Sequence, residues 1–323
     1  MTANPANPSR NGLPRMTTAP PGDAVLLTID LEDWHQIIRR DLGDPDWDRA
    51  GEAFPRQVDR LLALLDELRV RATFFVLGMT AARFPRELER VAKAGHPLAS
   101  HGFAHRPVRE QSRKVFTDDL RRCVDVLGTV TGQRPRGYRA PAFSITRRDT
   151  WLFDALAEEG FAYDSSLHDS PRVPDRIRPP FDGPFTLTTA SGTALVEYPV
   201  AVAHAPVTGT SLPVGGGTYW RLAPWAMVRW GLDRLRANGD APTLYLHPYE
   251  FDPDDLRLDT APRPPVAAAV EARYNLRRPR VAEQLARVAA RYAVTPIEDH
   301  LEHHRPARSA AFSSAGEHLR SPV

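Results

Sequence analysis

Apolar residues along this chain occur in two patterns. Short continuous runs predict buried strands. They lie at 24–29, 72–77, 97–99, 161–163, 243–246 and 293–297, with a hairpin expected from 185–187 and 195–200. Longer stretches with apolar residues three and four positions apart predict amphipathic helices. They lie at 55–69, 85–94, 117–131, 147–159, 224–237 and 281–292.

Strand and helix alternate through most of the chain, which predicts a parallel sheet with crossover helices and an α/β fold. Polar residues that can carry chemistry directly follow five of the apolar runs or strand ends. These are the acids of 30–33, the pair His101 and His105, and the single residues Arg139, Asp164 and His247. Because sites in parallel α/β proteins form at the carboxyl ends of strands, we expect these side chains to lie close together.

His101 and His105 are four residues apart, a spacing at which two imidazoles can face the same side of a helical turn. Two neutral imidazoles that converge on one point form half of a metal site. The spacing alone is weak, since two surface histidines would show it as well. The other four strand ends give it weight, because they offer the carboxylates and the base that a hydrolytic site needs.

Composition restricts the function classes further. The 42 basic and 40 acidic residues leave a net charge of +2, which does not favour binding to nucleic acid. One cysteine, Cys123, excludes an internal disulfide framework and falls on the apolar side of a predicted helix. No apolar run approaches the length of about 20 residues that crosses a bilayer.

The two ends of the chain are polar, and we expect a disordered tail at 1–22, a single catalytic domain at 23–300 and a disordered tail at 301–323. The segment 1–22 lacks the apolar core of a secretory signal. The sequence therefore predicts a cytoplasmic protein without a membrane span, and it leaves the oligomeric state open.

Five short motifs occur in an order that is typical of one family. They are Asp30-Leu31-Glu32-Asp33-Trp34, His101 to His105, Arg139-Ala140-Pro141, Asp164-Ser165-Ser166 and Leu244-Tyr245-Leu246-His247. With them the chain resembles carbohydrate esterase family 4, the polysaccharide deacetylases with a NodB-type domain. The resemblance covers about Asp23 to Ile297 and implies a distorted (β/α)7-type barrel. Leu212 to Gly217, His247 to Glu250 and Tyr274 to Leu276 are similar to a subgroup that accompanies exopolysaccharide and exosortase-type gene sets.

The resemblance implies a metal-dependent removal of N-acetyl groups from a glycan or a glycolipid precursor. It assigns the general base to Asp30, the divalent metal ligands to Asp33, His101 and His105, and the general acid to His247 with Asp164 as its partner. The metal would be Zn²⁺, with Co²⁺ as an alternative. Arg139 would pair with the base, the backbone N–H of Ala142 would stabilise the oxyanion, and Leu246 would form a wall of the acetyl pocket.

The chain departs from the family at two places. Three acids span four positions where the family has two adjacent acids, so Glu32 is an alternative ligand, and Glu32 with Asp33 could also replace the pair and displace Asp30. Ser166 occupies a position where relatives often carry Trp, which changes the acetyl pocket. Beyond the motifs, we expect Tyr219 and Trp220 to stack on sugar rings, because they follow a glycine-rich loop.

Two other functions compete with deacetylation. A hydrolase of small ureides or cyclic imides on the same fold would also depart from the adjacent acid pair. A glycan-binding scaffold without activity would need no metal ligands, and the acids and histidines argue against it. Turnover of ureides, or binding of chito-oligomers without turnover, would distinguish these alternatives.

Overall fold

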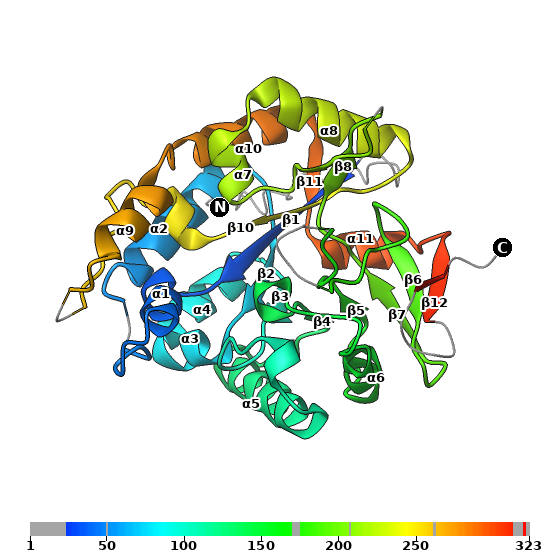
Figure 1. Ribbon diagram of the computed structural model, residues 1–323, viewed down its shortest axis with the longest axis horizontal. Helices are drawn as coiled ribbons and strands as arrows, with labels where there is room; N and C mark the ends of the chain where they lie inside the picture. Colours follow the sequence, from blue (N-terminus) through cyan, green and yellow to red (C-terminus); the bar gives the residue numbers. More distant parts are fainter. Residues whose placement is uncertain are drawn as a thin grey trace, which may run out of the picture.

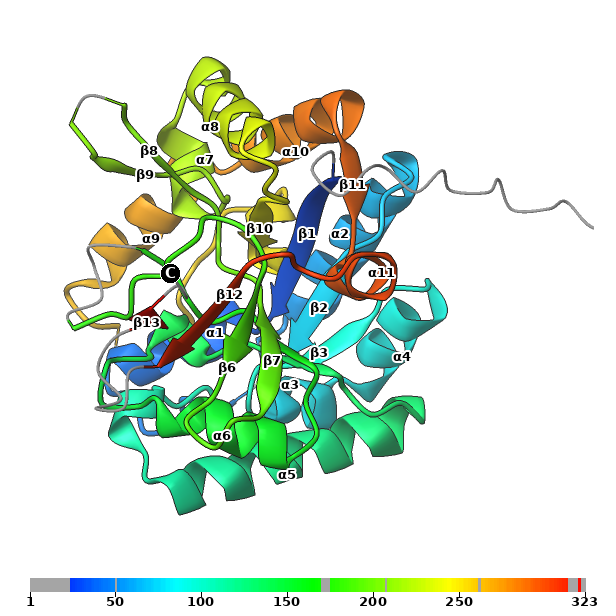
Figure 2. The same cartoon turned by 90° about the vertical axis from the view of Figure 1, so that its right-hand side faces the viewer.

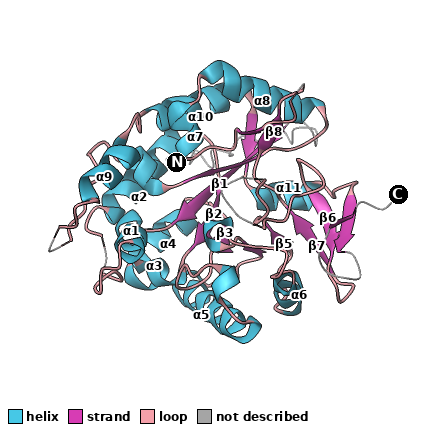
Figure 3. Ribbon diagram, in the orientation of Figure 1, coloured by secondary structure: helices cyan, strands magenta, loops and turns pink. Residues whose placement is uncertain are grey.

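The computed structural model describes residues 24–49, 51–169, 175–206, 208–260, 263–312 and 319–320. The expected tail at 1–22 lies outside these ranges. Strands form the inner layer and helices the outer layer, as Figures 1 and 3 show. Among the described helices, none has both the length and the hydrophobicity for crossing a bilayer.

The inner layer is a curved sheet whose first seven strands run parallel. β1 (Ala24–Leu31) is buried along its whole length, which explains its continuous apolar sequence. The parallel strands follow in the order β10 (Thr243–Leu246), β1, β2 (Thr73–Val76), β3 (Leu98–Ser100), β4 (Gly137–Tyr138), β5 (Tyr163–Asp164) and β7 (Ala194–Glu197). This arrangement confirms the predicted α/β class and the distorted barrel.

The barrel closes through single bridges between β10 and the segment after β7. Val200 pairs with Thr243 and Gly216 with Tyr245, and the Tyr245 N–H donates to the Gly215 carbonyl at 2.8 Å. A Cβ atom on Gly216 would lie 2.5 Å from the Tyr245 carbonyl oxygen, so glycine is required there. β11 (Ala293–Thr295) pairs only with the first three residues of β1, and β10 pairs with Leu26 to Ile29. These two irregularities distort the barrel.

The predicted helices cover the outside of the barrel. In α2 (Phe54–Glu67), Val58, Leu61 and Leu65 are buried against the sheet. α5 (Arg113–Thr131) begins at Ser112, whose hydroxyl accepts from the Val115 N–H, and ends at Gly132 with a φ of 71°. The remaining predicted helices are α4 (Pro85–Lys93), α6 (Trp151–Glu158), α8 (Trp225–Ala237) and α10 (Arg280–Arg291).

Several short elements were not predicted, because each carries too few apolar residues to show a period. They are α1 (Trp34–Asp41), α3 (Gly78–Arg83), α7 (Thr218–Leu222), α9 (Ala267–Asn275), α11 (Ile297–His303), β8 (Val202–His204) and β9 (Ser211–Pro213), with 3₁₀ turns at Val108–Glu110, Pro141–Phe143 and Pro248–Phe251. α1 follows the acid run directly, which affects the site.

The expectation of a disordered tail at 301–323 is wrong for the described part of that segment. β12 (Ser309–Phe312) pairs in parallel with β6 (Phe185–Thr188), the outer strand of the predicted hairpin, and in antiparallel fashion with β13 (Leu319–Arg320). Ala310 is fully packed against the barrel. The polar composition of the segment suggested disorder. Backbone hydrogen bonds hold β12 to the sheet, however, and β12 buries only one small residue. Figure 2 shows β12 beside β6.

His96 makes the stability of the fold depend on pH. Its buried Nδ1 accepts a hydrogen bond from the Ala72 N–H at 3.3 Å, which a protonated ring could not do. Burial and the nearby Arg71 lower the pKa of His96 to about 4. In the unfolded chain its pKa is about 6.5, so its contribution is complete above about pH 6.5 and is lost as pH falls towards 4.

We therefore expect His96→Gln to flatten the dependence of the unfolding free energy on pH. Between about pH 6.5 and 4 the wild type should lose on the order of 2–3 kcal/mol at this residue, and the variant should not. Urea denaturation across this range measures the difference. His303→Gln is the control, because His303 is exposed. Equal slopes for His96→Gln and wild type would contradict the assignment.

Candidate active site

Side chains from four strands of the parallel sheet meet at its carboxyl end. Asp30 lies within β1 and Glu32 follows it, His101 and His105 follow β3, Arg139 follows β4, and His247 follows β10. All are buried except His247, whose side chain is 13% exposed. His101 and His105 lie on a loop, not on the helical turn that their spacing suggested, and His105 has a φ of 51°.

Glu32, His101 and His105 form a cluster that could hold a divalent metal ion. One ligand atom from each lies within 4.8 Å of the other two. A Glu32 carboxylate oxygen is 3.0 Å from Nε2 of His105 and 3.7 Å from Nε2 of His101. Burial would raise the pKa of Glu32, but His105 with the other two histidines lowers it to about 2. Burial lowers the pKa of His101 to about 4, so both groups hold the protonation state of a ligand at neutral pH.

The two histidines differ in how well their tautomers suit a metal. The Nδ1–H of His101 donates to the Arg139 carbonyl at 2.8 Å, which leaves the Nε2 lone pair directed at Glu32. Nδ1 of His105 instead accepts from Arg40 at 3.0 Å. A metal at its Nε2 therefore needs the proton of His105 on Nδ1 and the Arg40 nitrogen moved away. The other Arg40 nitrogen donates to the carbonyls of Ala104 and His105, and these bonds can remain.

Arg139 holds Asp30 in place. Its guanidinium is completely buried and donates to the Asp30 carboxylate at 2.7 Å and to the Thr28 hydroxyl at 2.7 Å. The other side of the guanidinium donates to the carbonyl and the hydroxyl of Ser165, and the Phe75 ring lies 4.0 Å from its carbon. Because Arg139 is fixed on several sides, it holds the Asp30 carboxylate in one orientation, the contact expected between a general base and its partner.

His247 is positioned by Glu250, three residues further along the same 3₁₀ turn. One Glu250 oxygen lies 3.3 Å from Nδ1 of His247 and accepts from the His247 backbone N–H at 3.0 Å. Nε2 lies 3.5 Å from Glu32, and Tyr249 stacks on the ring at 5.0 Å. Burial would lower the pKa of His247, but the hydrogen bond to Glu250 and the charges of Glu32 and Glu250 raise it to about 9. The imidazole is therefore protonated at neutral pH.

Comparison with known proteins identifies the family of this chain. A model of the polysaccharide deacetylases matches residues 21–158, and one described as a domain of unknown function (DUF3473) matches residues 166–302. A crystal structure from Mycobacterium smegmatis, of a protein assigned to the polysaccharide deacetylases, is 30% identical, with a TM-score of 0.60 over 89% of this chain and 92% of that one. The chain belongs to the polysaccharide deacetylase family.

Curated relatives match a smaller part. A peptidoglycan deacetylase-like protein of Gibberella zeae is 34% identical over 35% of this chain, and a peptidoglycan deacetylase of Helicobacter pylori is 30% identical over 38%. The aligned regions span 34% and 40% of those two proteins. A crystal structure of PuuE allantoinase, 17% identical, has a TM-score of 0.57 over 92% of this chain and 97% of that one, and shows a shared fold.

The structure places Asp33 away from the ligand cluster, so the assignment of Asp33 as ligand is corrected in favour of Glu32. The Asp33 carboxylate starts α1, where it accepts from the N–H groups of His35 at 2.9 Å and Gly51 at 2.5 Å. A Cβ atom on Gly51 would lie 2.6 Å from this carboxylate. Both oxygens are thus engaged in holding a helix and a loop together.

Asp164 does not contact His247, and the predicted pairing of the two is wrong. Its carboxylate accepts from the backbone N–H and the hydroxyl of Ser166 at 3.0 and 2.7 Å. Burial raises its pKa, and burial beside Asp164 raises the pKa of Glu197 well above the usual range. A protonated Glu197 next to Asp164 explains how two buried carboxyl groups can adjoin.

Of the four predicted substrate-binding residues, the structure argues against one. Trp220 is completely buried, and its indole N–H donates to the Val214 carbonyl at 2.8 Å, so it does not face a sugar. Tyr219 is partly exposed and stays a candidate. Ala142 is exposed, with a φ of 53°, and Leu246 is buried. Ser166 donates to Asp164 and accepts from the Ala140 N–H, and it leaves no bulky wall.

Three residues near the site were missed. Arg40 holds the His105 loop from an unpredicted helix, and Glu197 lies on a hairpin strand far from any motif. Of the three, only Glu250 could have been predicted from the sequence. It lies three residues after His247, with Pro248 between them, and this spacing is typical of a capping turn.

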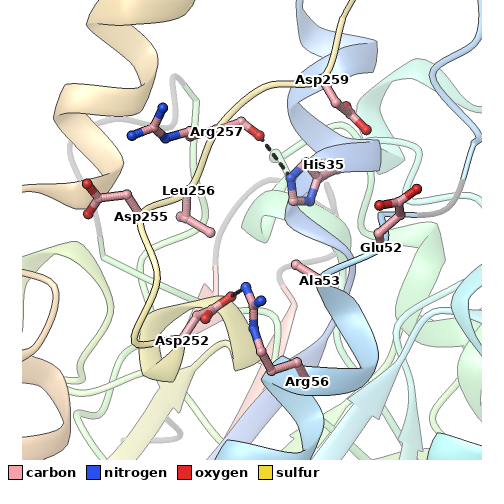
Figure 4. A pocket seen from close by; sticks show the side chains of 9 residues that line it. All are labelled: His35, Glu52, Ala53, Arg56, Asp252, Asp255, Leu256, Arg257 and Asp259. Atoms are coloured by element: carbon pink, nitrogen blue, oxygen red, sulfur yellow. Dashed lines mark hydrogen bonds and ion pairs between the residues drawn. The ribbon is translucent and has the colours of Figure 1, made fainter.

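A separate pocket of about 370 Å³ lies between α2 and the segment after the last 3₁₀ turn (Figure 4). Its lining includes His35, whose ring contacts the Arg257 carbonyl, and the ion pair of Arg56 with Asp252 at 3.0 Å. It contains none of the cluster residues, and we assign no catalytic role to it.

Proposed function

We propose that this protein is a metal-dependent hydrolase that removes N-acetyl groups from an N-acetylated sugar of a polysaccharide or its precursor. The observation that carries this proposal is the meeting of three ligand side chains, a carboxylate fixed by arginine and a protonated imidazole at one end of the barrel. Membership in the family and the names of the relatives support it.

The proposed roles combine the geometry of the site with the family resemblance. Asp30 takes a proton from the attacking water while Arg139 keeps the carboxylate oriented. As the carbon–nitrogen bond breaks, His247 donates a proton to the leaving amine, and acetate is released. Glu250 keeps the imidazole turned so that Nε2 faces the site. From the family resemblance we also propose that the Ala142 N–H supports the negative oxygen of the intermediate and that Leu246 forms a wall for the methyl group.

Glu32, His101 and His105 would hold the divalent ion. Two imidazoles and one carboxylate are a ligand set typical of Zn²⁺ hydrolases, and Co²⁺ accepts the same donors. The ion supplies Lewis acidity towards the carbonyl oxygen and lowers the pKa of water. The motifs around Leu212 to Gly217 and Tyr274 to Leu276 support a place beside exopolysaccharide synthesis. The cytoplasmic location stays a prediction.

Release of acetate from N-acetylglucosamine oligomers in the presence of Zn²⁺ or Co²⁺ tests the proposal. We expect His101→Ala and His105→Ala to lower turnover on the order of 100-fold or more, because each removes a ligand. His303→Ala, an exposed histidine on α11, is the matched control. Full activity in either ligand variant would refute the site.

The shared fold with an allantoinase makes ureides and cyclic imides the necessary comparison substrates. Turnover of these compounds without acetate release from the oligomers would favour the small-substrate alternative. Binding of the oligomers without turnover, whichever divalent metal is added, would favour the inactive scaffold.

A further inference from the structure

Positive charge is concentrated in the four helices α7 to α10. Residues 221–239 and 263–291 contain 11 arginines, no lysine and 3 acids, a net charge of +8. The whole chain carries +2, so all other residues together carry −6. Figure 1 shows α9, α10, α7 and α8 following one another along one edge of the molecule. These helical segments are therefore cationic, whereas residues 240–262 between them contain 6 acids and 1 arginine.

The same helices carry most of the exposed large apolar side chains. Among the described residues, five such side chains are exposed, and four of them lie here: Leu222 at 52%, Trp230 at 36%, Val266 at 46% and Leu276 at 52%. The fifth, Val115, is on α5. Single exposed apolar residues need no explanation, but their gathering on the arginine-rich edge does.

Leu222 and Leu276 belong to one junction. Leu222 ends α7 and Leu276 follows α9, and Arg221 joins the two helices by donating to the Tyr274 carbonyl at 2.5 Å. Arg280 at the start of α10 donates to the Arg221 carbonyl at 3.3 Å. We call Leu222, Trp230, Leu276, Arg273, Arg277 and Arg287 the docking patch.

The arginines of the docking patch are not neutralised. Arg263 pairs with Glu271, and Arg291 pairs with Asp233 at 3.0 Å. Arg273, Arg277 and Arg287 form no ion pair with any described residue, and all three are exposed. Arg277 follows Leu276 in the chain, and the other unpaired guanidinium groups lie on the helices that carry the exposed apolar side chains, so these helices are both cationic and apolar.

We propose that the docking patch binds the surface of a lipid bilayer that contains anionic lipids. An anionic polymer would satisfy the arginines, but it offers no apolar phase for two half-exposed leucines. A bilayer surface satisfies both, because arginines attract its anionic headgroups while leucine and tryptophan enter the boundary of the acyl chains. The binding is peripheral and does not depend on catalysis.

The docking patch adjoins the catalytic residues. The Tyr274 ring, two residues before Leu276, lies 5.9 Å from the Tyr249 ring, which stacks on His247. Docking through this patch would therefore bring the His247 side of the site towards the membrane surface. A glycan attached to a lipid would reach the site there.

Sedimentation with vesicles of phosphatidylcholine containing about 30% phosphatidylglycerol tests this, against vesicles of phosphatidylcholine alone. We expect binding to the anionic vesicles only, with weakening of tenfold or more as salt rises from about 50 to 500 mM. Each arginine contributes about fivefold, so Arg273→Gln with Arg277→Gln and Arg287→Gln should weaken binding roughly 100-fold. Leu222→Ser with Leu276→Ser should weaken it about tenfold or more at constant charge.

The control variants remove arginines and an apolar side chain from exposed positions outside the docking patch. Arg60→Gln with Arg83→Gln and Arg106→Gln takes away the same charge from other exposed positions, and Val115→Ser removes the fifth exposed apolar side chain. Wild-type binding by the patch variants, or equal loss in the controls, would overturn the proposal. Quenching of wild-type tryptophan by brominated lipid needs no variant. If there is no quenching while a soluble polyanion displaces the vesicles, the patch binds a polymer and the proposal is wrong.

Discussion

Glu32→Gln is expected to weaken Zn²⁺ binding on the order of 100-fold or more, while Asp33→Asn should leave the affinity within a few-fold. The first change removes the only carboxylate within reach of His101 and His105 among the described residues. The second leaves the ligand cluster intact and affects the start of α1. Titration of the apoprotein with Zn²⁺ against a competing chelator measures both affinities.

Both variants should lower the unfolding free energy of the metal-free protein, for different reasons. Asp33→Asn keeps an oxygen that can cap α1 but loses the oxygen that accepts from the Gly51 N–H, and we expect it to lower the unfolding free energy by about 1 kcal/mol. Glu32→Gln removes a carboxylate whose pKa is lowered to about 2 in the folded protein, so the metal-free variant should also unfold more easily than wild type at neutral pH. An Asp33→Asn protein that no longer binds Zn²⁺, beside a Glu32→Gln protein that does, would reverse the assignment.

His247→Asn is expected to lower kcat by roughly 10²- to 10⁴-fold without changing Zn²⁺ affinity, because it removes the proton donor and no ligand. Glu250→Gln should lower kcat by roughly tenfold or more, since the ring loses the carboxylate that orients it. KM should change little in either variant. Steady-state rates of acetate release, measured from pH 6 to 10, provide the comparison.

Asp164→Asn is the matched control for the partner of His247. Because Asp164 contacts Ser166 and Glu197 and not the imidazole, we expect kcat to fall no more than about threefold. The Glu250→Gln profile should also lose activity at a lower pH than wild type, because Glu250 raises the pKa of His247. A larger loss in Asp164→Asn than in Glu250→Gln would restore the partner that the motif order suggested.

The apolar runs predicted the parallel strands because these strands are buried on both faces, while the barrel was implied by the resemblance of the five motifs. β1 and β10 were visible for this reason, and so was the meeting of their polar ends. Short elements such as α1 and β12 stayed hidden, since neither holds enough apolar residues for a period. The prediction of a disordered C-terminal segment failed because β12 is held by backbone pairing with β6.

The prediction of Asp33 as a metal ligand was wrong for a reason that strand geometry explains. Side chains two residues apart along a strand share a face, so Asp30 and Glu32 point to the same side, and Asp33 points away. Asp33 then caps the helix that follows. The choice of Asp164 failed for another reason, because the order of the motifs does not reveal that a 3₁₀ turn brings Glu250 back to His247.

A crystal structure of the Zn²⁺-loaded protein tests the central claim most directly. We predict an ion bonded to a Glu32 oxygen and to Nε2 of His101 and His105, each at about 2.0–2.2 Å. The Asp33 carboxylate should still accept from Gly51 and His35. An ion bound by Asp33 in place of Glu32, or one that leaves both histidines unbonded, would contradict the account.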